Sequence, residues 1–206
     1  MSLRLGIDIG GTFTDFVLLD TARGHALAGK VLTTPHDPVA GVLRGLHDLL
    51  GQAELELAAL DGISHATTLV TNAIIERKGA LTGLLTTAGF RDLLEIGREA
   101  RYDLYDLFLT KPEPLVPRRR RLEVRERIGA DGTEREPLDA DGLARALGEL
   151  AALGVESLAV VFLHAYANDA HELHAARLIA EGWTRPGISV SLSSRVAPEI
   201  REYERL

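Results

Sequence analysis

Apolar and polar residues alternate over the first part of the chain in the manner of half-buried β-strands. Three such runs open the sequence, over residues 3–9, 13–19 and 25–33. The triplet Gly10-Gly11-Thr12 separates the first two runs, which predicts a tight hairpin. After Asp37 and Pro38 the apolar spacing becomes that of an amphipathic helix ending near Gly51, with Asp37 as its expected cap.

The rest of the chain continues to mix strands and helices. Apolar runs over residues 63–67 and 81–86 flank an expected helix over 69–77, so the first elements are ordered βββαβαβ. Residues 112–137 are rich in proline and arginine, and Asp131-Gly132 predicts a hairpin turn there, between residues 122–128 and 133–137. The remaining elements are a helix, a strand, a helix, a strand and a final helical stretch, over residues 139–153, 157–163, 169–181, 188–192 and from Pro198. This order predicts a mixed α/β protein.

Composition narrows the range of functions. With 46% hydrophobic and 26% charged residues, the 206-residue chain is long enough for one large or two small cores. A formal net charge of -7 opposes a broad contact with nucleic acid or an anionic membrane surface, and no segment approaches the length of a membrane span. The absence of cysteine excludes disulfides and a thiolate nucleophile. We therefore expect a cytoplasmic protein with a small-molecule or protein partner.

The first hairpin carries the side chains best suited to bind a phosphate. Gly10 and Gly11 can adopt positive φ and let backbone N–H groups come close to an anion. The hydroxyls of Thr12 and Thr14 can donate further hydrogen bonds, and Asp8 is a hard oxygen ligand suited to Mg²⁺. The alternative is a plain hairpin whose polar side chains bond locally.

A second candidate group follows the strand over residues 63–67. Thr67 and Thr68 open the next helix, which carries Asn72, and their hydroxyls together with free N–H groups favour an anion. Simple capping by either threonine explains the same pattern. His65 is interpreted as a hydrogen-bonded structural residue.

Three charged segments lead to different interpretations. Arg98 offers a planar fork to a substrate carboxylate or carbonyl, although surface ion pairs with its acidic neighbours are the favoured explanation. The run Arg118-Arg119-Arg120-Arg121 predicts a solvated loop or subunit contact. The segment His171-Glu172-Leu173-His174 lacks the spacing of a zinc protease motif and is predicted to be a helix surface.

Taken together, these segments resemble a known family. Asp8-Ile9-Gly10-Gly11-Thr12 is similar to the first phosphate motif of the actin, hexokinase and Hsp70 superfamily. With the segments from His65 to Gly79 and from Pro198 to Arg205, the chain resembles the hydantoinase A and 5-oxoprolinase family over nearly its whole length, in the same order. That combination is more specific than the phosphate motif alone.

The resemblance implies a fold and its division. We expect a ribonuclease H-like (actin-like ATPase) lobe with a mixed five-stranded type of sheet, plus a smaller α/β subdomain. The expected boundaries are a phosphate-binding lobe over residues 1–110, an insertion or hairpin over 111–138, and a second α/β segment over 139–206. Since no stop signal closes the last helical stretch, the polypeptide is expected to continue into a further lobe.

The resemblance also implies an activity and residue roles. The complete enzyme would couple hydrolysis of ATP, with Mg²⁺, to the opening of a cyclic amide by phosphorylating its carbonyl oxygen. Asp8 and Asn72 would be catalytic, with Asp8 also the metal ligand and Arg98 the substrate candidate. The expected ATP-binding residues share the two loops described above: Gly10, Gly11, Thr12, Thr14, Thr67 and Thr68.

Several alternatives stay open at this point. Members of the family also act as ketone carboxylase subunits of the acetone type, and a nucleotide-binding regulatory module without turnover fits the same motifs. A sugar or acyl kinase is disfavoured by the segments that follow the phosphate motif. The expected partner is a hydantoinase B-like subunit or domain, in an oligomer when full length, and the 206 residues alone are expected to be inactive.

Overall fold

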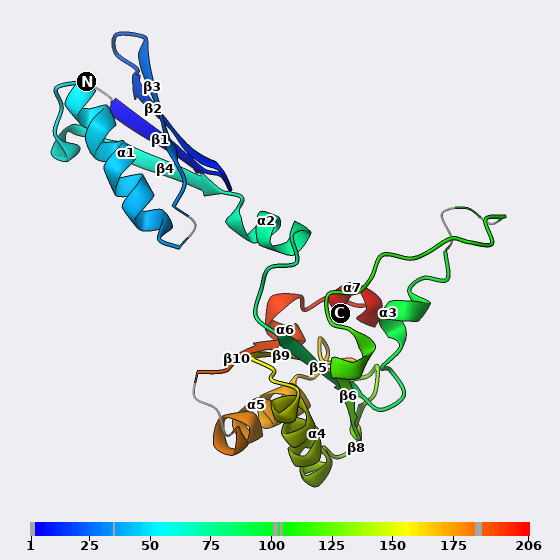
Figure 1. The fold of residues 1–206 in the computed structure, drawn as a ribbon. Helices are drawn as coiled ribbons and strands as arrows, with labels where there is room; N and C mark the ends of the chain where they lie inside the picture. Colours follow the sequence, from blue (N-terminus) through cyan, green and yellow to red (C-terminus); the bar gives the residue numbers. More distant parts are fainter. Residues whose placement is uncertain (1–2, 35, 101–102, 104, 184–186) are drawn as a thin grey trace. The chain divides into compact units, whose positions relative to one another are not determined.

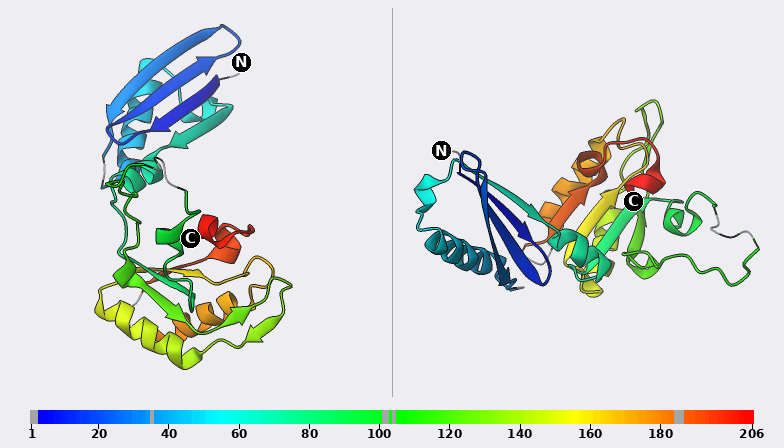
Figure 2. Two further views of the ribbon diagram at one scale, coloured as in Figure 1. Left: turned by 90° about the vertical axis from the view of Figure 1, so that its right-hand side faces the viewer. Right: turned by 90° about the horizontal axis from the view of Figure 1, so that it is seen from above.

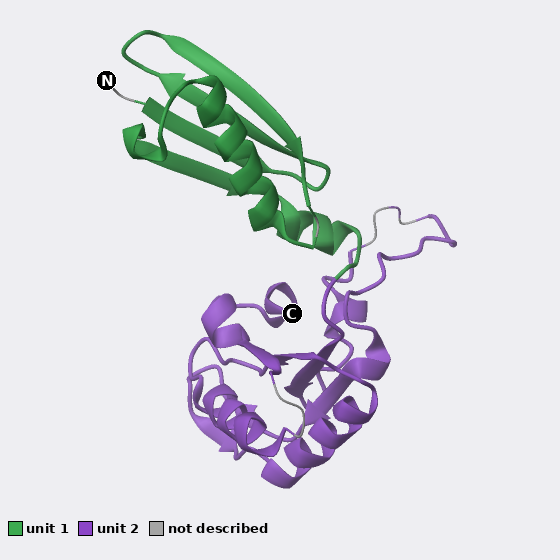
Figure 3. Ribbon diagram, turned by 60° about the vertical axis from the view of Figure 1, so that its left-hand side comes forward, with its two compact units in different colours: residues 1–78 green, residues 79–206 purple. Residues whose placement is uncertain are grey.

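The computed structural model describes residues 3–34, 36–100, 103, 105–183 and 187–206 (Figure 1). They fall into two compact units, Met1–Lys78 and Gly79–Leu206 (Figure 3). Each unit has its own sheet and its own buried apolar cluster.

Unit 1 is built on a four-stranded sheet in the order β3-β2-β1-β4 (Figures 1 and 2). Its strands are β1 (Leu3–Ile9), β2 (Phe13–Asp20), β3 (His25–Leu32) and β4 (Gly62–Thr67). The first three form an antiparallel meander, and β4 joins β1 in parallel. The hairpins and strands predicted for residues 3–33 are therefore confirmed.

Helix α1 (Pro38–Gln52) covers one face of this sheet. Asp37 caps it as predicted, because its Oδ1 accepts a hydrogen bond of 3.0 Å from the Ala40 N–H. Leu49 of the helix packs with residues of β1 and β2 in one apolar cluster, whose buried members are Leu5, Ile7, Ile9, Phe16, Leu18 and Leu49. A 3₁₀ turn, η1 (Leu57–Ala59), leads into β4, and α2 (Leu69–Ile75) follows it.

Unit 2 holds a second four-stranded sheet, in the order β10-β9-β5-β6, in which all neighbours are parallel. Its strands are β5 (Thr82–Thr87), β6 (Arg121–Val124), β9 (Ser157–Val161) and β10 (Ser189–Leu192). Helices α4 (Ala140–Ala152) and α5 (Ala170–Gly182) lie side by side on one face (Figures 1 and 2). The short elements are α3 (Leu93–Ile96), η2 (Arg118–Arg120), β7 (Arg127–Ile128), β8 (Glu134–Glu136), α6 (Ser193–Val196) and α7 (Glu202–Arg205).

The place of β5 differs from the expected division at residue 110. The strand lies in unit 2, so the first sheet has four strands where the resemblance implied five. Residues 83–87 are all buried, and a strand covered on both faces and paired on both edges suits the centre of a parallel sheet. The sheet that β5 joins is set by its pairing with β6 and β9, which are distant in sequence, and the local residue pattern does not encode that pairing.

The proline- and arginine-rich segment is only partly the predicted hairpin. Gly132 has a φ of +76° and forms the turn, with β7 and β8 antiparallel on either side of it. The preceding strand β6 instead pairs in parallel with β5.

The predicted helix surface at His171 and Glu172 is wrong: both side chains are buried, and Glu172 is 0% exposed. None of the helices in the described residues is long and apolar enough to cross a membrane.

Candidate functional site

The β1–β2 turn requires glycine for space rather than for an unusual backbone angle. Gly10 N–H donates to the Phe13 carbonyl at 2.9 Å, and a Cβ on Gly10 would lie 2.9 Å from that same oxygen. A Cβ on Gly11 would lie 2.9 Å from Nδ2 of Asn72. Neither glycine has a positive φ, so the expected reason for their presence is corrected to close approach.

Asp8 lies on the solvent side of the sheet just before this turn. Strand alternation buries Ile7 and Ile9 toward α1 and leaves Asp8 exposed on the opposite face. Its cross-strand neighbour on β2 is Asp15, whose carboxylate pairs with Nζ of Lys30 at 3.0 Å. Within the described residues, the Asp8 carboxylate itself has no hydrogen bond or ion pair. It is therefore available to a ligand beside the turn.

The two threonines of the hairpin have different environments. Thr12 is exposed, and its carbonyl accepts a hydrogen bond from the Thr33 N–H at 3.0 Å. Thr14 is 1% exposed, with its hydroxyl 3.0 Å from Oγ1 of Thr33, which in turn donates to the Gly10 carbonyl at 2.9 Å. The expected phosphate contact from Thr14 is thus corrected: strand alternation turns its side chain toward the core, where it braces the turn from within.

The start of α2 is tied to the end of β1. The Thr67 hydroxyl donates to the Ile9 carbonyl at 3.2 Å and accepts from the Leu69 N–H at 3.2 Å. The Thr68 N–H donates to the same Ile9 carbonyl at 3.2 Å, and its hydroxyl accepts from Nδ2 of Asn72 at 3.4 Å. Local bonding therefore engages the Thr67 hydroxyl, whereas Thr68 at the N-cap of α2 makes no side-chain cap hydrogen bond. The Asn72 carboxamide lies beside Gly11.

Unit 1 accordingly brings together most of the predicted site. Because β1 and β4 are parallel neighbours, their carboxyl ends meet at one edge of the sheet. Seven of the predicted residues lie at or near this edge: Asp8, Gly10, Gly11, Thr12, Thr67, Thr68 and Asn72. Among the described residues there is no group of three or more metal-ligating side chains. A Mg²⁺ ion here would take one oxygen from Asp8 and the others from phosphate and water, which suits its chemistry.

Arg98 belongs to unit 2 and is engaged by a carboxylate of its own chain. Its Nε lies 2.6 Å from Oε1 of Glu204 in α7, and its Nη2 contacts the same oxygen. The Arg98 hydrogen bond holds the pKa of Glu204 below its ordinary value. An ion pair was the favoured interpretation of Arg98, and its partner lies 106 residues away in sequence rather than among its acidic neighbours.

Sequence reasoning missed a buried polar network at the carboxyl edge of the unit 2 sheet. Glu172 accepts hydrogen bonds from Phe162 N–H at 3.1 Å, Ser194 N–H at 2.9 Å and the Ser193 hydroxyl at 2.5 Å. Arg205, also buried, donates from Nη2 to the Phe162 carbonyl and to Oγ of Ser193, each at 2.7 Å. Its members come from separate elements, so no spacing along the chain could have shown it.

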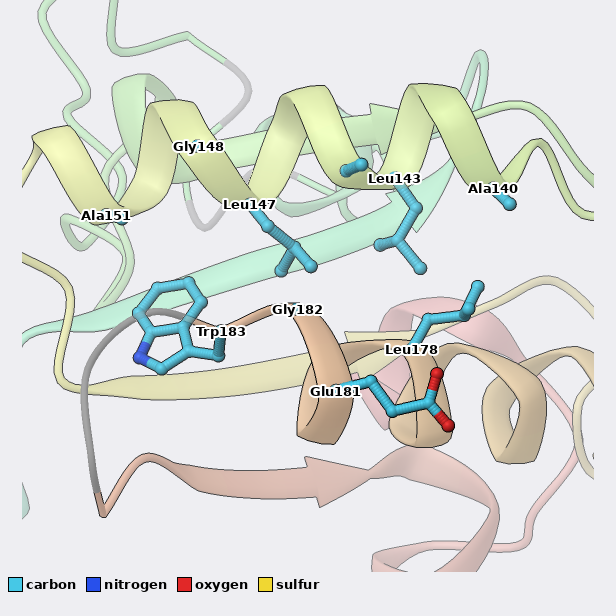
Figure 4. A pocket seen from close by; sticks show the side chains of 10 residues that line it. Ala140, Leu143, Leu147, Gly148, Ala151, Leu178, Glu181, Gly182 and Trp183 are labelled. Carbon is cyan, nitrogen blue, oxygen red and sulfur yellow. The ribbon is translucent and has the colours of Figure 1, made fainter.

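An apolar recess of about 440 Å³ lies elsewhere in unit 2, between α4 and α5 (Figure 4). Leu143, Leu147, Leu178 and Trp183 form its walls, with Glu181 at its edge. It holds none of the predicted site residues and no arrangement of polar groups suited to catalysis.

Comparison with known proteins gives this geometry a context. The model of the hydantoinase/oxoprolinase N-terminal region matches residues 4–182. An uncharacterised protein of Methanocaldococcus jannaschii is 39% identical over 100% of this chain. The caprolactamase subunit alpha of Pseudomonas jessenii is 37% identical, and 5-oxoprolinase 1 of Arabidopsis thaliana is 34% identical, each over 98% of this chain. The chain spans 30% of the first two proteins and 18% of the third.

Two solved structures share the fold over 98% of this chain and 30% of their own. One is a nucleotide-free acetone carboxylase, with a TM-score of 0.86 and 29% identity, described with a mechanism of ATP-dependent acetone carboxylation. The other is the ATP-dependent caprolactamase of Pseudomonas jessenii, with a TM-score of 0.82 and 35% identity. The expected α/β fold of the actin-like ATPase type is thereby confirmed.

Proposed function

Because this chain belongs to the family of hydantoinase/oxoprolinase N-terminal regions, we propose that it is the ATP-binding portion of a longer enzyme that opens a cyclic amide. The observation that carries the proposal is the unpaired carboxylate of Asp8 beside the tight Gly10–Thr12 turn. Relatives named as ATP-dependent caprolactamase and 5-oxoprolinase act on cyclic amides by name, which supports this substrate class.

The chemistry explains why such an enzyme needs ATP. An amide carbonyl is stabilised by resonance, so water attacks it poorly. Transfer of the γ-phosphoryl group of ATP to the carbonyl oxygen releases ADP and converts that oxygen into a good leaving group. Water then attacks the activated carbon, and the ring C–N bond breaks as the nitrogen takes up a proton, which leaves an acyl phosphate. A second water hydrolyses this acyl phosphate to the carboxylate and free phosphate. Phosphoryl transfer demands positioning and charge neutralisation more than covalent help.

The residues of unit 1 meet those demands at separate atoms. The N–H groups of Gly11 and Thr12 and the Thr12 hydroxyl would donate to the terminal phosphates, while the Gly10 N–H stays bonded to the Phe13 carbonyl. The Asp8 carboxylate would hold Mg²⁺, which neutralises phosphate charge when bound. Thr68 and Asn72 lie next to the turn, whereas Arg98 would have to exchange Glu204 for a substrate carbonyl before it could bind substrate. The roles of these residues are part of the proposal.

A second candidate function is a subunit of an ATP-dependent ketone carboxylase. The likeness to acetone carboxylase favours it, with a TM-score of 0.86. Both functions would use the same turn and aspartate, so they differ in the substrate and not in the nucleotide site. In either case we propose a hydantoinase B-like partner, since the relatives include a caprolactamase subunit alpha and an acetophenone carboxylase gamma subunit.

Replacement of Asp8 by Asn tests the proposal in the complete enzyme. The variant keeps the shape of the side chain but loses the charge that would hold Mg²⁺, so ATP turnover should fall by about 100-fold or more while the fold stays intact. Release of ADP is measured with candidate lactams, ketones and sugars, and circular dichroism monitors the fold.

Asp48→Asn on α1 is the matched control, because it removes one exposed carboxylate of the same unit away from the turn. It should turn over ATP at the wild-type rate. Wild-type turnover in Asp8→Asn would remove Asp8 from its proposed role. Stimulation of ADP release by a ketone and by no lactam would favour the carboxylase alternative.

A further inference from the structure

Resting on the proposed nucleotide site, we infer that Asn72 is a positioning residue that holds the phosphate-binding turn in place through Gly11. The carboxamide of Asn72 occupies the space that a side chain at position 11 would fill. Its Nδ2 lies 2.9 Å, and its Cγ 3.8 Å, from the place of a Cβ on Gly11. Glycine at this position therefore admits the carboxamide, and the carboxamide supports the turn.

The carboxamide is itself held in a fixed frame. Asn72 lies in the first turns of α2, where its N–H donates to the Thr68 carbonyl at 2.8 Å and its Nδ2 to the Thr68 hydroxyl at 3.4 Å. Thr68 in turn donates from its N–H to the carbonyl of Ile9, the last residue of β1. The support for the turn thus comes from the same strand that leads into it.

The turn is fixed on its other side by Thr33. The Thr33 N–H donates to the Thr12 carbonyl at 3.0 Å, and its hydroxyl donates to the Gly10 carbonyl at 2.9 Å. Between these contacts lies Gly11, a residue type with more accessible backbone conformations than others, and neither Thr33 bond reaches its carbonyl. A turn whose N–H groups face the phosphates before binding holds the nucleotide more tightly than a turn that becomes ordered only on binding. Packing of Asn72 against Gly11 supplies this order.

The two glycines provide an internal comparison. A Cβ on Gly10 would meet the backbone oxygen of Phe13, which no side-chain substitution can remove. A Cβ on Gly11 would meet only the end of the Asn72 side chain. Gly11→Ala should therefore displace the carboxamide and reproduce the loss of Asn72, whereas Gly10→Ala should damage the turn independently of Asn72.

The test is a double-mutant cycle on MgATP affinity in the complete enzyme, measured by titration calorimetry. We expect Gly11→Ala and Asn72→Ala each to weaken binding about tenfold, a size common for residues in direct contact. Their combination should also be about tenfold weaker, because both remove one and the same contact. The Gly10→Ala/Asn72→Ala variant should bind MgATP more weakly than wild type by the product of the two single fold-changes, because the two substitutions act independently.

Several results would overturn the inference. A multiplicative loss of about 100-fold in the Gly11→Ala/Asn72→Ala variant would mean that the two residues act separately, as they would if Asn72 touched the phosphates itself. Wild-type affinity in Gly11→Ala would do the same. Asn72→Ser replaces Asn72→Ala in the cycle if the alanine variant does not fold.

The failure of the proposed function is distinguishable from this outcome. If the wild-type enzyme binds no MgATP, the nucleotide site is refuted, and the same cycle is then read in the free energy of unfolding. Coupling between positions 11 and 72 in unfolding, with none between positions 10 and 72, would retain the contact and its support of the turn. Independent effects in unfolding would refute the positioning role as well.

Discussion

At the scale of single residues, the buried polar side chains of unit 2 depart most from what local sequence suggests. Glu172 lies between His171 and His174 on α5, a helix with many polar residues, yet its side chain is 0% exposed. Its carboxylate accepts three hydrogen bonds, two of them from backbone N–H groups, one just after β9 and one in α6. The buried carboxylate is tolerated because these donors satisfy its oxygens, and the donors in turn gain the acceptor that they would otherwise lack.

Replacing Glu172 with Ala should consequently destabilise unit 2 strongly. The substitution leaves the Phe162 and Ser194 N–H groups and the Ser193 hydroxyl without their acceptor, at a cost of about 3–5 kcal/mol in the free energy of unfolding. Urea titration followed by circular dichroism measures it. Glu181→Ala, an exposed glutamate of the same helix, should change stability by at most about 0.5 kcal/mol. Equal effects of the two substitutions would contradict the assigned network.

At the scale of elements, α1 shows how tertiary packing overrides helix propensity. The helix contains two glycines, Gly45 and Gly51, in addition to Gly41 near its start. Gly45 is buried, and a Cβ there would overlap the ring of Phe16 and lie 3.1 Å from Cγ1 of Val31. Gly51, near the end of the helix, has nothing within 4 Å of a Cβ. The first glycine lets the helix approach the sheet, and the second has no packing reason.

The two glycines should therefore respond in opposite directions to alanine. Gly51→Ala should stabilise unit 1 by up to about 1 kcal/mol, the usual difference in helix propensity. Gly45→Ala gains the same propensity but must displace Phe16 of β2, so it should destabilise the unit by about 1–3 kcal/mol. Thermal unfolding of the two variants gives both signs in one experiment. Stabilisation by Gly45→Ala would show that α1 does not pack on the sheet through this residue.

At the scale of the whole molecule, exposed ion pairs and turns hold acidic groups in their charged form in unit 2. Hydrogen bonds from Arg118 to Asp92, from Thr133 to Asp131 and from Arg98 to Glu204 lower the pKa of each carboxyl. A carboxyl whose folded pKa is lowered contributes stability above its unfolded pKa and loses it as the pH falls through its folded pKa. These groups therefore favour the folded state at neutral pH and cease to do so in acid.

Arg98→Gln isolates one of these contributions. The variant should be less stable than wild type at pH 7, and the difference should shrink as the pH falls below about 4.5, the ordinary pKa of Glu204, because protonation removes the pair from both proteins. Since the pair is exposed, 1 M salt should narrow the difference at pH 7 as well. Urea midpoints across the pH range measure it. A difference that stays constant into acid would show that Arg98 acts through packing and not through charge.

The sequence by itself determined the strands of unit 1, the start of α1 and the exposure of Asp8. Alternating apolar residues fixed the strands of unit 1, Asp37 and Pro38 fixed the start of α1, and the exposed position of Asp8 follows from strand alternation between Ile7 and Ile9. These features depend on residues that are close in sequence, where periodicity and turn chemistry act directly.

Only the tertiary structure decided which elements share a sheet and which side chains meet. The place of β5 beside β6 and β9, the burial of Glu172, the pairing of Arg98 with Glu204 and the contact of Asn72 with Gly11 join residues that are distant in sequence. Such contacts form because every buried backbone and side-chain polar group needs a hydrogen-bond partner. The partners are found among residues that are close in space and not among neighbours along the chain.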